Sequence, residues 1–123
     1  MSRPDRSGLP EQIIAAYDRL IDSVEGAERK GATMPYTSIN GNMSSFLSPE
    51  GILALRLSPA DRSTFIDRFE TALYETHGHV MKEYVAVPPA VLVDTATLAP
   101  WFRASWTYVA GLKPKATTRQ KAS

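Results

Sequence analysis

Three segments of the chain repeat apolar residues at the three- and four-residue spacing of an amphipathic helix. They are residues 10–26 (Ile13, Ile14, Tyr17, Leu20, Ile21, Val24), residues 58–74 (Phe65, Phe69, Leu73) and residues 97–112 (Leu98, Trp101, Phe102, Val109, Leu112, with the small Ser105 on the same face). Pro10 suits a first turn, and Ser58-Pro59 combines a capping hydroxyl with a proline at the first helical position. Because proline deep inside a helix costs about 3 kcal/mol, Pro100 predicts that the third helix begins no earlier than about Thr97.

The segments between these helices have the composition of β-strands. Asn40-Gly41-Asn42 separates two extended runs, and an Asn-Gly pair favours the type I′ turn of a hairpin. Leu53, Leu55 and Leu57 alternate, which places them on one face of a third strand. A short strand or turn before Gly78 and a longer strand over residues 80–87, stopped by Pro88-Pro89, complete the pattern.

This order of elements predicts the fold class. The chain reads α-β-β-β-α-β(-β)-α, which indicates an α+β two-layer sandwich with an antiparallel sheet and the helices on one of its faces. At 123 residues we expect a single domain over residues 9–112, preceded by a flexible arm at 1–8 and followed by a disordered basic tail at 113–123.

Charge and composition indicate which kinds of partner and which cell compartment to expect. Four of the 14 basic residues (Lys113, Lys115, Arg119, Lys121) lie in the last eleven positions, so the rest of the chain carries ten bases against 13 acids. Outside the tail the chain is therefore net negative, which is unsuited to binding nucleic acid. We expect only weak binding of nucleic acid through the basic tail. The absence of cysteine, of a signal peptide and of a long apolar run predicts a cytoplasmic protein without a membrane partner, and we expect no cofactor.

Three short landmarks between Lys30 and Lys115 resemble the N-terminal domain of the TfoX/Sxy family, whose founding members regulate natural competence in bacteria. They are Asn40-Gly41-Asn42-Met43 leading to Phe46, Leu53-Ala54-Leu55-Arg56, and Met81-Lys82-Glu83-Tyr84-Val85-Ala86-Val87-Pro88 followed by an aromatic last helix. The resemblance implies a secretion-chaperone-like two-layer sandwich. We expect a stand-alone domain, and Met34-Pro35-Tyr36-Thr37 replaces the family's usual Met-Phe-Gly-Gly.

Polar residues of the first hairpin and of the last strand are candidates for a ligand-binding groove. Five residues form this set: Tyr36, Asn40, Asn42, Lys82 and Tyr84. Thr37, Ser44 and Ser45 add hydroxyl groups to the same hairpin. The competing interpretation, which we favour, is the solvated face of a one-sided sheet.

Two further pairs of residues suggest chemistry. His77 and His79 flank Gly78 and are weak candidates for a metal pair, which would need additional ligands such as Glu75 or Glu83. Trp106 and Tyr108 fall beside the buried stripe of the last helix, so they predict an exposed patch for a protein partner or for self-association as a dimer.

The sequence contains no Gly-x-Ser-x-Gly elbow and no other catalytic motif that we recognise. We therefore predict a non-enzymatic interaction or regulatory domain. The alternative is a small-ligand-binding protein, or an enzyme without a recognised motif, that uses the polar face of the sheet. A hollowed sheet favours the second hypothesis, and a flat sheet with exposed aromatic residues favours the first.

Overall fold

A computed structural model describes residues 8–31 and 33–114 of the chain. The predicted arm and basic tail fall almost wholly outside these described residues. The elements are, in chain order, α1 (Glu11–Asp22), β1 (Tyr36–Ile39), β2 (Asn42–Leu47), β3 (Leu53–Arg56), α2 (Pro59–Phe69), β4 (Leu73–Thr76), β5 (His79–Val87), α3 (Pro89–Leu92) and α4 (Thr95–Ala110). This order confirms the predicted α+β fold class.

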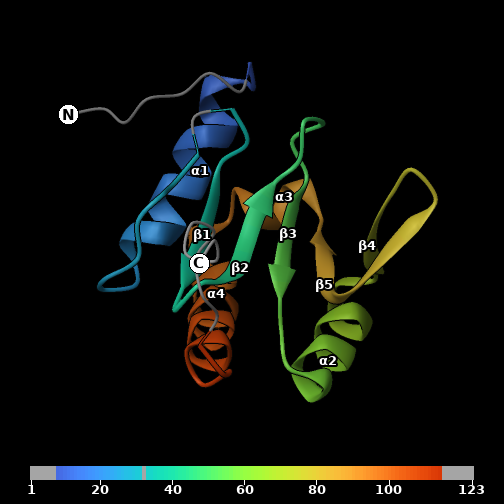
Figure 1. Cartoon of the computed structure of the whole chain (residues 1–123). Helices are drawn as coiled ribbons and strands as arrows, with labels where there is room; N and C mark the ends of the chain where they lie inside the picture. The colour runs from blue at the N-terminus through green and yellow to red at the C-terminus, as the bar shows by residue number, and fades with distance from the viewer. Residues whose placement is uncertain (1–7, 32, 115–123) are drawn as a thin grey trace.

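The five strands form one antiparallel sheet in the order β1-β2-β3-β5-β4 (Figure 1). The first three strands are the predicted meander, and β5 pairs with β3 so that the short strand β4 lies at an edge. The β1–β2 turn is Asn40-Gly41, both with positive φ (56° and 81°), as a type I′ turn requires.

The helix boundaries follow local chemistry with one correction. The Ser58 hydroxyl accepts a hydrogen bond from the backbone N–H of Asp61 at 3.3 Å and caps α2, as predicted. However, α4 begins at Thr95, capped by Asp94, and Pro100 lies inside it. The lost hydrogen bond is tolerated because both Pro100 and Ala96, whose carbonyl would have been the acceptor, are exposed to water. The one-turn helix α3 was not predicted.

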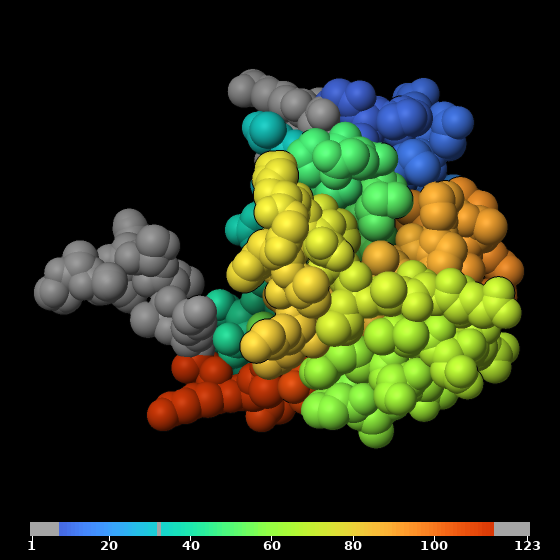
Figure 2. Space-filling model, turned by 90° about the vertical axis from the view of Figure 1, so that its right-hand side faces the viewer, coloured from blue at the N-terminus to red at the C-terminus, as the bar shows by residue number. Residues whose placement is uncertain are grey.

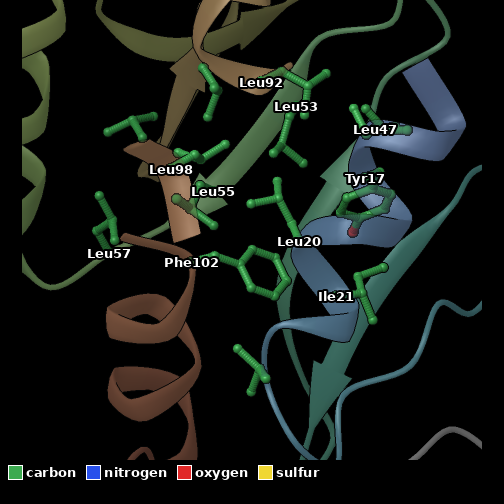
Figure 3. Packing of buried hydrophobic residues seen from close by; sticks show 14 of the residues in the cluster. Tyr17, Leu20, Ile21, Leu47, Leu53, Leu55, Leu57, Leu92, Leu98 and Phe102 are labelled. Carbon is green, nitrogen blue, oxygen red and sulfur yellow. The ribbon is translucent and has the colours of Figure 1, made fainter. Parts of the chain in front are cut away.

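The main hydrophobic core lies between the helices and one face of the sheet (Figure 3). Leu53, Leu55 and Leu57 are fully buried there, which confirms their predicted common face. All four helices contribute to this core, through buried residues that include Tyr17 and Leu20 of α1, Phe65 of α2, Leu92 of α3, and Leu98 and Phe102 of α4. Within the described residues, no helix is long and apolar enough to cross a bilayer.

Candidate functional site

The sheet has a second face that no helix of the described chain covers, and its side chains are also apolar. Tyr36, Phe46, Ala54 and Ala86 form one row across β1, β2, β3 and β5, as the strand register shows. They belong to a second cluster, separate from the main core, which we call the open-face cluster. Its members are Phe46, Ala54, Tyr74 and Tyr84, which are buried, and Tyr36, Met43, Ile52, Met81 and Ala86, which are partly buried.

Aromatic rings form the centre of the open-face cluster. The ring of Phe46 meets that of Tyr74 edge-on at a centroid distance of 5.3 Å and that of Tyr84 at 5.7 Å. Next to Phe46 on β3 is Ala54, whose small side chain leaves room between the flanking rings. The small residues Ala54 and Ala86 thus lie side by side on β3 and β5, and larger side chains surround them on this face.

A β-bulge on β2 decides which residues reach the open face. The register with β1 shifts by one residue between Thr37 and Ser38, because Thr37 pairs with Ser45 whereas Ser38 pairs with Met43. The extra residue is Ser44. Since a bulge changes the alternation of side chains along a strand, Met43 joins Phe46 in the open-face cluster although three positions separate them.

The hydroxyl groups of the hairpin lie on the helix side of the sheet. Thr37 and Ser45 alternate with Tyr36 and Phe46 of the open face, and the bulge adds Ser44 to the same side. Thr37 Oγ1 lies 2.7 Å from Ser44 Oγ and 2.6 Å from Ser45 Oγ, and Ser45 Oγ lies 2.7 Å from Tyr17 Oη of α1. Thr37, Ser44 and Ser45 are buried, so the interpretation of these hydroxyl groups as a solvated face is wrong. Burial in this network raises the pKa of Tyr17, which keeps its hydroxyl protonated.

A closed loop brings Met34 beside the open face. The backbones of Lys30 and Tyr36 exchange two hydrogen bonds, of 2.8 and 2.9 Å, and the Pro35 carbonyl accepts from the Leu47 N–H at 2.9 Å. Gly31 has φ of +77°, and a Cβ there would lie 2.5 Å from the Met34 carbonyl oxygen. The loop therefore requires glycine at this position, and it leaves the Met34 side chain 42% exposed.

The β4–β5 hairpin forms the opposite border of the open face. Figure 2 shows this hairpin in yellow as a ridge on the surface beside α2. Its turn is His77-Gly78, with φ of 50° and 73°. The β4–β5 register is irregular between Leu73 and Glu75. Tyr74 lies at this irregularity, and both Tyr74 and Met81 belong to the open-face cluster.

These elements enclose an apolar hollow of about 340 Å³ on the open face. Its lining is Met34, Met43, Phe46, Pro49, Tyr74, Thr76, His77 and Met81. Three of the four methionines of the chain therefore line one hollow. Thioether side chains are flexible and polarisable, so a surface of this composition adapts to apolar groups of different shape.

A second hollow, of about 370 Å³, adjoins the first and has a different chemistry. It is lined by Arg56 and by residues 79–84, and Met81 belongs to both hollows. Arg56 donates from Nε to Glu83 Oε1 at 2.8 Å, and its guanidinium lies 5.8 Å from the centroid of the Tyr84 ring. Burial alone would lower the pKa of Arg56, but the hydrogen bond to Glu83 and the charges nearby raise it, so Arg56 stays cationic.

The predicted ligand-binding residues divide between this face and other parts of the fold. Tyr36 and Tyr84 belong to the open-face cluster, and the exposed Lys82 lines the second hollow with Tyr84. Burial raises the pKa of Tyr84, whose hydroxyl donates to the Met43 carbonyl at 3.0 Å. In contrast, Asn40 is an exposed turn residue, and Asn42 Nδ2 donates to the Lys113 carbonyl at 3.0 Å beyond the end of α4.

The two histidines are separated by their turn. Both are exposed, and His77 lines the apolar hollow whereas His79 lines the second one. Among the residues that the structure describes, no three His, Cys, Asp or Glu side chains are grouped as a metal site would need. The weak metal hypothesis therefore gains no further ligand from the described part of the fold.

The predicted aromatic surface of the last helix lies in the helix layer. Trp106 and Tyr108 are both half-buried, and Trp106 packs partly against the main core. Trp101 on the same helix meets the ring of Phe65 edge-on at 5.2 Å. A protein partner or self-association through Trp106 and Tyr108 stays a prediction.

Sequence reasoning named His77, as a metal candidate, but missed the other residues that line the apolar hollow. Met34, Met43 and Met81 have no common period, and Phe46 and Tyr74 fall in strands that are short and irregular. The available signal was weak: three of four methionines lie within or beside predicted strands, where a one-sided sheet should expose polar residues.

Comparisons with known proteins add no identification. No protein-family model, no curated protein and no solved structure matches this chain. The resemblance to the TfoX/Sxy N-terminal domain therefore stays a prediction, and function must be argued from the site itself.

Proposed function

We propose that this chain is a non-enzymatic binding domain whose binding surface is the open face of the sheet. The observation that carries the proposal is the apolar hollow, in which methionines from a loop and two strands surround the rings of Phe46 and Tyr74. A contiguous exposed apolar surface is costly in water unless a ligand or partner covers it.

The distribution of polarity also supports this proposal. Hydroxyl groups that would suit a solvated face are buried under α1, while aromatic and thioether groups lie on the side without a helix. The stability of the fold does not require apolar side chains on the open face, because the main core is already formed between the helices and the other face. Occupation by an apolar group explains this distribution directly.

The hollowed sheet favours the second of the two hypotheses drawn from the sequence, a small-ligand-binding protein. The interaction or regulatory role implied by the resemblance to the TfoX/Sxy family is compatible with it, since a bound ligand can serve regulation. The cytoplasmic location remains part of the same prediction.

A neutral fluorescent probe tests the apolar hollow without involving charge. We expect N-phenyl-1-naphthylamine to bind with increased fluorescence and Met34→Lys to weaken this binding at least tenfold, because the ammonium group enters the apolar lining. Val93→Lys is the matched control. Val93 is 50% exposed and Met34 42%, but Val93 lies at the end of α3 and outside the hollow.

Two results would contradict the proposal. The first is no saturable binding by the unsubstituted protein, and the second is an equal loss in both variants. Thermal melts of the two variants should agree within a few degrees, because both replaced side chains are exposed.

A further inference from the structure

We infer that the two adjoining hollows form one site for a small amphiphilic carboxylate, with the apolar body in the methionine-lined hollow and the carboxylate beside Lys82. This inference rests on the proposed function and names the class of ligand for the same surface. It combines the shape of the open face with the charge at one of its ends.

The two hollows adjoin each other at one shared residue. Met81 lines both, and the backbone of Met43, which lines the apolar hollow, is held by two residues of the other one. Arg56 Nη1 donates to the Met43 carbonyl oxygen at 3.2 Å, and Tyr84 Oη donates to the same oxygen at 3.0 Å. A ligand of modest length can therefore reach from one hollow into the other.

The charges of the second hollow favour an anion. Its charged residues are Arg56, Lys82 and Glu83, and Glu83 is already paired with Arg56. Within the described chain, the exposed Lys82 ammonium group has no ion pair. The imidazole of His79 adds a potential hydrogen-bond donor to the same lining. The surplus positive charge thus lies at the end of an apolar surface.

The size and composition of the apolar part indicate a small, flexible ligand body. About 340 Å³ is near the lower limit of the roughly 300–1,000 Å³ typical of small-molecule sites. The polar groups of this lining belong to Tyr74, Thr76 and His77. A ligand body with many polar atoms would therefore bury some of those atoms without a hydrogen-bond partner. A medium-length alkyl chain or a single aromatic ring meets both conditions.

Decanoate and 1-decanol are a matched pair of probes, since they share the alkyl chain and differ in charge. Both are titrated into the ¹⁵N-labelled full chain below their aggregation limits. We expect saturable shifts at the amides of Met43, Met81 and Tyr84 with either probe. Lys82→Gln should weaken decanoate about two- to fivefold and leave decanol unchanged, because an exposed ion pair contributes that much. Raising the salt concentration should act in the same selective way.

Arg68→Gln is the control for loss of one positive charge, because Arg68 is exposed on α2 in the helix layer. It should change neither affinity. Decanol binding with no selective effect of Lys82→Gln on decanoate would overturn the carboxylate inference and leave the proposed function intact. If neither probe binds at the open face, both proposals fail. Binding of decanoate at amides of the helix layer alone would also overturn the inference.

Discussion

The two faces of this five-stranded sheet have the same strands but different surroundings. On the helix side, Leu53, Leu55 and Val85 are fully enclosed by the helix layer. On the open side, Phe46 and Tyr84 are covered mainly by neighbouring rings and by partly exposed methionines. The first face packs against the helix layer of the same chain, whereas the second is the face that we propose binds a ligand.

This difference separates stability from function in the molecule. Truncating a side chain of the helix face leaves a cavity, whereas truncating one of the open face only changes an existing hollow. The helix face should therefore carry most of the unfolding free energy, and the open face should tolerate substitution with a loss of binding. Four measurements test this difference between the two faces.

The largest expected effect is that of Leu55→Ala on the helix face. Leu55 is fully buried, so the free energy of unfolding should fall by about 2–5 kcal/mol. The matched substitution Met43→Ala on the open face should cost about 1 kcal/mol or less, because Met43 is only partly buried. Urea unfolding followed by circular dichroism gives both values. Equal losses would abolish the distinction between the two faces.

The buried hydroxyl network should have the next largest effect. Ser45→Ala removes the partner of Tyr17 Oη and should lower the free energy of unfolding by about 1–3 kcal/mol. In a double-mutant cycle, Tyr17→Phe combined with Ser45→Ala should cost less than the sum of the single substitutions, since no buried hydroxyl is then left without that partner. Strict additivity would mean that the two residues do not interact.

Alkaline titration tests the same network through its tyrosine. The pKa of Tyr17 is raised above its ordinary value of 10.0, so the unfolded chain loses this proton at a lower pH than the folded protein. Its contribution to stability is complete below about pH 10 and decreases above it, by up to about 1.4 kcal/mol per pH unit. Comparing Tyr17→Phe with the unsubstituted protein isolates this slope from those of other groups. Identical pH profiles would show that Tyr17 ionises normally.

The smallest effect is expected on the open face. Glu83→Gln breaks the ion pair with Arg56. The Glu83 side chain is 43% exposed and that of Arg56 20%, so the free energy of unfolding should fall by at most about 1 kcal/mol. Added salt should reduce the difference between variant and unsubstituted protein, because exposed charges are screened. Chemical unfolding at low and high ionic strength measures this difference in the free energy of unfolding. A loss of stability as large as that of Leu55→Ala would mean that the open face contributes to the unfolding free energy as much as the main core does.

Local sequence signals were sufficient for much of the fold. The alternation of Leu53, Leu55 and Leu57, the Asn40-Gly41 turn and the Ser58-Pro59 cap each predicted the element that the structure contains. These signals depend on backbone geometry and side-chain periodicity within a few residues, which a sequence displays directly. The start of α4 was misjudged because the cost of Pro100 depends on the exposure of its neighbours, which is not a local property.

The candidate site, in contrast, was decided by tertiary structure. Tyr36, Lys82 and Tyr84 were among the predicted residues, but the methionines were not. The bulge turned Ser44 inward and Met43 outward, and pairing between distant strands brought Met81 and Phe46 into one cluster. The three longer helices, the strands, the hairpin turn and the buried leucine face could be predicted from local patterns, because periodicity and turn chemistry act within a few residues. Only the folded sheet decided which side chains share the open face, because register and bulges depend on contacts between residues far apart in the chain.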